Sequence, residues 1–167
     1  MEKKVLTEQA LYYGDVSMPK GFEINKEKLI SDIYHSTFIE KEFPFSKSWD
    51  MLNTYIKDHI NGKYKIQLIN KKTWGNIYKS NEVTQPLLNV DPVDLKNSPD
   101  FTMLYGVKTN NCWIRISYDD NRRKGRSWDI ELKENMFVIF PATNGYFLVN
   151  NHKSDFNFVQ TITYEFV

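Results

Sequence analysis

The first segment with a clear pattern covers residues 5–16, which mix β-forming residues with polar ones and predict an edge strand. The run Met18-Pro19-Lys20-Gly21 is expected to break that strand. Apolar residues then recur at helical spacing. Asn25 stands just before them and is a suitable N-cap, so the pattern predicts a short helix that carries Leu29, Ile30 and Ile33.

A second helix is predicted further along, with Ser46 or Ser48 as its N-cap. Its apolar positions fall into one stripe, as expected of a helix that packs on a core through one face. The pair Asn61-Gly62 is expected to end it. The stripe consists of Trp49, Leu52, Ile56 and Ile60.

After Gly62 the period changes from helical to alternating, which predicts strands separated by turns rich in Asn, Asp and Gly. About eight short strands after two helices predict a mainly β, α+β fold: a double-sheet jelly roll, or double-stranded β-helix, with the helices on one face. The expected strands lie near Ile66 and Leu68 and at 74–78, 101–107, 112–118, 128–132, 136–140, 146–149 and 156–166.

One domain is expected over residues 1–167, with a strand and two helices at about 1–62 packed on a β core at about 63–167. No repeat or long linker divides the chain. Residues 82–99 contain three prolines and no period, which predicts a long loop, and long loops in compact domains are often functional.

The amino-acid composition and the net charge argue against several classes of function. Aromatic residues make up 15% of the chain and the formal net charge is +1, so we expect a packed core and no global attraction to nucleic acid or to an acidic membrane. We see no signal peptide after Met1 and no run of about 18 apolar residues that would span a membrane. The chain is therefore expected in a cytosol or within a larger particle.

Jelly-roll domains often hold a metal ion, so the histidines are the first candidates for a functional site. A non-haem iron site needs two histidines and a carboxylate, and the chain has three histidines, none with a carboxylate two residues away on a strand. We interpret His35 and His59 as surface residues of the helices and His152 as a turn residue.

The sequence also gives no support for acyl transfer or for acid/base catalysis. The single cysteine, Cys112, lies in an apolar strand pattern and is expected to be a buried, unreactive core residue. The pair Asp119-Asp120 is expected in a hairpin turn. We therefore expect no cofactor and lean toward a protein that is not an enzyme.

The most distinctive run of the chain is a basic cluster expected at a hairpin tip: Arg122, Arg123, Lys124 and Arg126. Arginine suits contacts with phosphate and carboxylate groups, so this hairpin is a candidate partner-contact surface. The alternative is a solvated turn whose charges pair with Asp119, Asp120 and Asp129.

The tryptophans Trp74, Trp113 and Trp128 are expected in the core or on a sheet face. The last strand is expected to place Gln160 on a mainly apolar face, and an exposed part of that strand could pair with another chain.

Two segments resemble the prolyl-hydroxylase-type 2-oxoglutarate/iron(II) oxygenase-like domains that tailed phages encode. Trp74-Gly75-Asn76-Ile77-Tyr78 is similar to the W-x-N strand that leads into the iron-binding H-x-H or H-x-D of that group. Phe137-Val138-Ile139-Phe140-Pro141-Ala142 is similar to the L-x-x-F-P-S strand that precedes the distal iron histidine. The resemblance covers about half the chain, from Trp74 to its end.

The family's functional residues do not carry over. Counting from the two motifs, the iron-ligand positions fall near Leu87, Asn89 and Tyr146, and the 2-oxoglutarate-clamping arginine falls near Val159 or Gln160. None of these residues matches the family pattern, so the resemblance implies an oxygenase-like domain that lacks its metal and its co-substrate.

The leading hypothesis is a non-catalytic jelly roll that acts as a structural or adaptor component of a tailed-phage particle, through contacts with other protein subunits. Its expected location is the virion, with the cytoplasm as the alternative, and nucleic acid and membrane are not expected partners. One alternative is an oxygenase or small-molecule binder with non-standard ligands. Another is a cytosolic protein that binds a host protein through the arginine hairpin.

Overall fold

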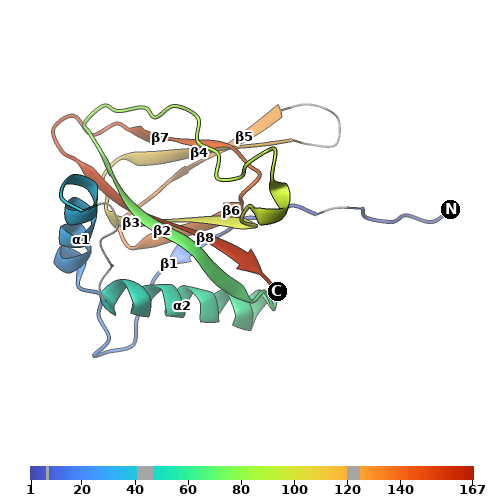
Figure 1. The fold of residues 1–167 in the computed structure, drawn as a ribbon, viewed down its shortest axis with the longest axis horizontal. Coiled ribbons are helices and arrows are strands. Elements are labelled where there is room, and N and C mark those ends of the chain that lie inside the picture. The colour runs from blue at the N-terminus through green and yellow to red at the C-terminus, as the bar shows by residue number, and fades with distance from the viewer. Residues whose placement is uncertain (7, 41–46, 120–124) are drawn as a thin grey trace.

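The computed structural model describes residues 1–6, 8–40, 47–119 and 125–167, and two antiparallel sheets face each other in it (Figure 1). The larger sheet has the order β1-β6-β3-β8-β2, with bounds Tyr12–Asp15, Met136–Pro141, Phe101–Lys108, Asn157–Phe166 and Leu68–Tyr78. The smaller sheet has the order β5-β4-β7, with bounds Gly125–Glu131, Cys112–Asp119 and Tyr146–Asn150. The expected double-sheet fold is confirmed.

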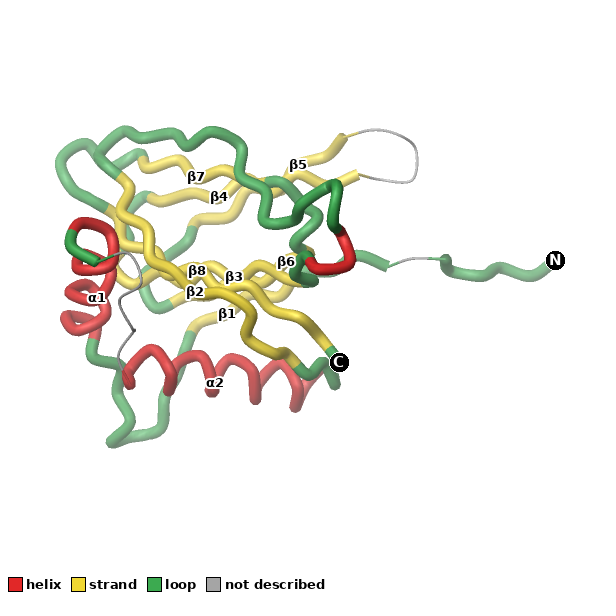
Figure 2. Tube along the Cα trace, viewed as in Figure 1, coloured by secondary structure: helices red, strands yellow, loops and turns green. Residues whose placement is uncertain are grey.

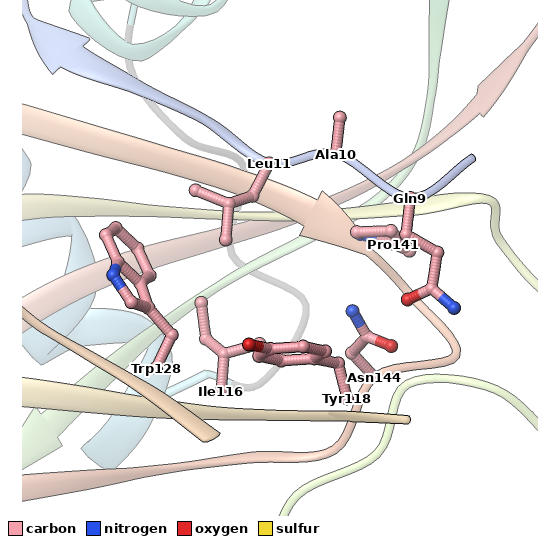
Figure 3. A pocket seen from close by; sticks show the side chains of 8 residues that line it. All are labelled: Gln9, Ala10, Leu11, Ile116, Tyr118, Trp128, Pro141 and Asn144. Atoms are coloured by element: carbon pink, nitrogen blue, oxygen red, sulfur yellow. The ribbon is translucent and has the colours of Figure 1, made fainter. Parts of the chain in front are cut away.

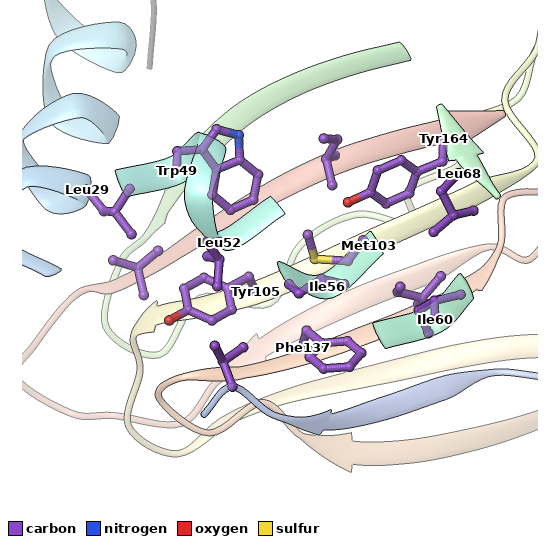
Figure 4. Close-up of a cluster of buried hydrophobic side chains, with 14 of the residues drawn as sticks. Leu29, Trp49, Leu52, Ile56, Ile60, Leu68, Met103, Tyr105, Phe137 and Tyr164 are labelled. Atoms are coloured by element: carbon purple, nitrogen blue, oxygen red, sulfur yellow. The ribbon is translucent and has the colours of Figure 1, made fainter. Parts of the chain in front are cut away.

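Both described helices lie on the outer face of the larger sheet (Figure 2). Helix α1 (Lys26–Phe38) begins at Asn25, whose side chain accepts a hydrogen bond from the amide of Lys28, as an N-cap does. Helix α2 (Lys47–Tyr64) buries the predicted stripe against the sheet (Figure 4). That first core joins Trp49, Leu52, Ile56 and Ile60 to Met103, Tyr105, Ile162 and Tyr164.

A second core fills the space between the two sheets. The strands alternate, so every second residue of the larger sheet points away from the helices and toward the smaller sheet. The members of this core are mostly aliphatic and aromatic, and they include Leu104, Phe140, Tyr146, Leu148 and Val159.

The predicted long loop connects β2 with β3 and is not free of structure. Its early part pairs with β7 through two isolated bridges, Val83 with Val149 and Leu87 with Tyr146. A short 3-10 turn, Leu95–Asn97, follows. The loop therefore extends the smaller sheet at its β7 edge. Neither described helix has the length and apolar run needed to cross a bilayer.

Three expectations about elements are wrong. The first strand covers only Tyr12–Asp15 of the expected 5–16. Helix α2 continues through Asn61 and Gly62 to Tyr64, and Ser48 lies inside it and so is not its cap, while Ser46 lies outside the described residues. The strand at the end of the chain, β8, pairs with β3 on one side and β2 on the other, so it offers no open edge to another chain.

Candidate functional site

Three of the positions predicted from sequence come together at the start of β7. The backbone of Leu87 exchanges two hydrogen bonds with that of Tyr146, at N···O distances of 2.7 and 3.0 Å. The side-chain amide of Asn89 donates to the Tyr146 hydroxyl at 3.2 Å. The long loop and β7 thus bring together the two segments that the sequence motifs single out.

A fourth residue, Thr102, completes this group. The same amide nitrogen of Asn89 donates to Thr102 Oγ1 at 3.0 Å. Thr102 lies on β3 of the larger sheet and Tyr146 on β7 of the smaller one, and both are buried. We call Asn89, Thr102 and Tyr146 the Asn89 bridge, because the amide joins the loop to both sheets. Sequence reasoning missed Thr102, since its strand pattern marked it only as a β-forming residue.

The Asn89 bridge is electrically neutral and lies against the apolar core. Burial raises the pKa of the Tyr146 phenol, and the hydrogen bond from Asn89 opposes that rise, so the phenol carries its proton at neutral pH. The ring of Phe140 meets the Tyr146 ring edge to face, with centroids 5.1 Å apart. Leu87 packs against the same core.

The co-substrate arginine is expected near two neighbouring residues of β8, Val159 and Gln160, which point to opposite faces of the sheet. Val159 is fully buried in the core between the sheets. Gln160 points to the helix side, where its Nε2 donates to Thr73 Oγ1 at 3.2 Å, and its Oε1 has no partner among the described residues. Strand β8 contains no lysine or arginine.

The arginine hairpin is described only in part. Arg122, Arg123 and Lys124 lie outside the described residues, as does Asp120. Arg126 is exposed on β5 and pairs in register with Tyr118 of β4. Asp129, a charge partner of the hairpin in the alternative interpretation, accepts two hydrogen bonds from Arg115, at 2.7 and 2.8 Å, and this contact lowers the pKa of Asp129.

The histidines and the cysteine do not join the Asn89 bridge. His35 and His59 lie on α1 and α2, and His152 lies in the turn between β7 and β8. Cys112 is fully buried, and burial raises the pKa of its thiol to about 12. Within the described parts of the chain, no three His, Cys, Asp or Glu side chains gather into a group that could hold a metal ion.

Comparisons with known proteins support the fold. A prolyl-4-hydroxylase from Pseudomonas putida superposes with a TM-score of 0.67 at 11% identity, over 94% of this chain and 86% of that one. The nickel complex of the non-haem monooxygenase ThoJ gives 0.65 at 9% identity, over 94% and 74%. A prolyl hydroxylase from Trichoplax adhaerens, bound to a hypoxia inducible factor peptide fragment, gives 0.61 at 8% identity, over 93% and 83%.

These likenesses establish that the chain has the double-stranded β-helix fold of 2-oxoglutarate/iron(II) oxygenases. No family model matches the chain, and no curated protein matches it by sequence.

Iron(II) and 2-oxoglutarate, which this fold implies, do not fit the residues present at the predicted positions. The leucine side chain offers no donor atom, Asn89 could offer only a neutral amide oxygen in place of a carboxylate, and a protonated phenol is a weak ligand for iron(II). At the clamp position, Val159 offers no charge to a carboxylate. We therefore derive no chemical step through either group.

Proposed function

We propose that this protein is a non-catalytic form of the oxygenase fold that works by binding other proteins. The Asn89 bridge is the observation that carries the proposal. At the positions where counting from the sequence motifs places the family's metal ligands, one amide joins the loop to both sheets through two neutral oxygens. Such a group stabilises a rigid framework and supplies neither a ligand set nor an acid/base pair.

The specific form of the proposal is a structural or adaptor component of a tailed-phage particle. It rests on the resemblance of the two sequence motifs and on the basic hairpin, of which exposed Arg126 is the described member. The test is mass spectrometry of purified source particles, followed by a structure of the particle. We expect the chain to bury at least about 1,000 Å² against other subunits. A particle that lacks the chain would remove this form of the proposal.

The second candidate is an oxygenase or small-molecule binder with non-standard ligands. The comparisons favour this class over the contact role, because the similar structures carry the names of hydroxylases and a monooxygenase. Calorimetric titration with iron(II) and 2-oxoglutarate under anaerobic conditions separates the two candidates. Saturable binding of both supports the enzyme, and no heat of binding supports the contact role.

A third candidate is a cytosolic protein that binds a host protein through the same hairpin. Affinity capture from an infected host and from the purified particle distinguishes it from the first. Capture of one host protein in the lysate, with no copy of the chain in the particle, would favour the third candidate.

A further inference from the structure

A pocket of about 380 Å³ lies at the edge of the sandwich where β1 and β6 approach β5 (Figure 3). It is formed by residues from the segment before β1, from both strands of the β4–β5 pair, and from β6 and the turn after it. We call it the Trp128 pocket, and its lining residues are Gln9, Ala10, Leu11, Ile116, Tyr118, Trp128, Pro141 and Asn144. Leu87, Asn89, Tyr146 and Val159 are not among them, so the pocket does not contain the positions at which the sequence motifs place the metal ligands and the co-substrate arginine.

The walls of the Trp128 pocket are largely apolar and include two aromatic rings. Figure 3 shows Trp128 and Tyr118 on its sides, with Leu11 above and Ile116 between the rings. The Trp128 ring also contacts the ring of Tyr13 of β1, with centroids 5.6 Å apart. The indole offers a flat surface on which a ligand ring can stack.

The polar groups of the pocket are neutral. Gln9 and Asn144 bring their side-chain amides to one end (Figure 3), and each amide offers both donors and an acceptor. None of the eight described lining residues carries a charge. The eight lining side chains offer a charged ligand no ion pair, although Arg126 stands opposite Tyr118 in register, whereas a neutral group that hydrogen-bonds to an amide would be well matched.

We propose that the Trp128 pocket binds a neutral, flat aromatic ligand of one or two fused rings that carries an amide-like donor and acceptor. Ligand pockets usually measure about 300–1,000 Å³ and combine apolar walls with a few polar groups. The volume of about 380 Å³ lies near the lower end of that range and limits the ligand to a small one. This site goes beyond the proposed contact role and does not depend on it.

The test uses three probes with one ring system and different charges: 2-naphthamide, 2-naphthoate and 2-naphthamidine. The chain has four tryptophans, so NMR of the nitrogen-labelled protein gives four indole N–H signals, which W128L and W113L help to assign. We expect 2-naphthamide to shift the Trp128 signal with a Kd of about 1 mM or lower. The Trp113 signal, from the outer face of the smaller sheet, should stay in place.

The variants distinguish binding in this pocket from nonspecific binding elsewhere on the protein surface. W128L should weaken 2-naphthamide binding about tenfold, because the stacking surface is lost. W113L is the matched control, since it removes an exposed tryptophan of β4, and it should change the Kd less than about twofold. N144L removes one amide and leaves the aromatic walls, so it tests the polar contact if W128L fails to fold, and it should weaken binding several-fold.

Each other outcome overturns the proposal. Absence of 2-naphthamide binding, or binding that W128L and N144L leave unchanged, would exclude this pocket as the site. Binding of 2-naphthoate or 2-naphthamidine as tightly as 2-naphthamide would contradict the inference that the ligand is neutral.

Discussion

At the scale of single residues, the Asn89 side chain occupies a position at which, by counting from the sequence motifs, oxygenases of this fold would carry a metal ligand, and it forms hydrogen bonds there. Asn89 Nδ2 has two hydrogens and donates to two buried oxygens, one on each sheet. Counting from the sequence motifs assigned Leu87, Asn89 and Tyr146 to the metal-ligand positions of the family. In the structure Leu87 and Asn89 are each hydrogen-bonded to Tyr146. The partner Thr102 could not be predicted, because no sequence motif points to a contact between side chains on different strands.

Replacing Asn89 with alanine should lower the free energy of unfolding by about 1–3 kcal/mol, because two buried hydroxyl groups lose their donor. Chemical denaturation of N89A measures this loss. Asn151→Ala is the control, since Asn151 is exposed, and its cost should stay within about 0.5 kcal/mol. Equal stability of N89A and N151A would mean that the Asn89 bridge contributes nothing to the fold.

Cys112 gives a pH-dependent prediction at the same scale. The pKa of its thiol is about 12 in the native protein against a reference value of 9.0, so above pH 9 the unfolded chain loses a proton that the native state keeps. Stability therefore falls as the pH rises from 9, by up to about 1.4 kcal/mol per pH unit for this group. Burial also raises the pKa of Tyr78, Tyr105 and Tyr164, which adds to the fall.

The Cys112→Ala variant keeps the tyrosines and loses the thiol. Urea unfolding between pH 9 and 11 should therefore show a shallower decline of stability with pH in C112A than in the native chain. The slope below pH 8 should match between the two proteins. Equal slopes above pH 9 would show that the thiol of Cys112 ionises in the native protein as it does in water.

At the scale of elements, the period of the sequence predicted both helices and most strand positions. It could not predict strand order, because pairing depends on contacts between distant segments. β8 alternates apolar and polar residues, as an edge strand often does, yet its polar residues Thr161 and Thr163 are buried between the sheets. Similarly, Gly62 weakens a helix without ending it, and α2 continues for two more residues.

Gly75 of β2 shows how α1 and the larger sheet fit together. A Cβ atom at this position would lie 2.5 Å from Ile33 Cγ1 of α1, so only glycine allows the helix to pack this closely. Gly75→Ala should cost about 1–3 kcal/mol of stability through overpacking. In I33A the obstructing atoms are gone, so G75A should cost much less in that background.

Gly62→Ala is the matched control for this cycle. A Cβ atom at Gly62 meets nothing within 4 Å, and the residue lies in α2, so alanine should raise stability by up to about 1 kcal/mol. Thermal unfolding of the native chain, G75A, I33A, the double variant G75A/I33A and the control G62A measures these costs. Additive costs for G75A and I33A would contradict the contact between α1 and β2 as we describe it.

At the scale of the whole molecule, the helices cover one face of the larger sheet and the smaller sheet covers the other (Figure 1). The outer face of the smaller sheet and the ends of the sandwich remain open to partners. The described ends of the arginine hairpin, Asp119 and Gly125, pair with each other at the end of the β4–β5 ladder.

We propose that Arg122, Arg123 and Arg126 form a contact surface, so replacing all three with alanine should change the free energy of unfolding by less than about 1 kcal/mol. Assembly with the partner should fail, measured by incorporation of the variant into particles during complementation. A matched variant, Lys3→Ala/Lys4→Ala, removes positive charge from the other end of the sequence and should assemble normally. A triple variant that unfolds would show that these arginines hold the fold together.

The central claim is that the Asn89 bridge replaces a metal centre, and metal analysis tests it most directly. The chain is purified without chelators, titrated anaerobically with iron(II), and compared with the variant L87H/N89D/Y146H, which carries the two-histidine, one-carboxylate set at the same positions. Our account predicts less than about 0.1 equivalent of bound iron for the native chain and a gain of iron binding in the variant. About one equivalent of iron in the native chain, with 2-oxoglutarate binding beside it, would contradict the account.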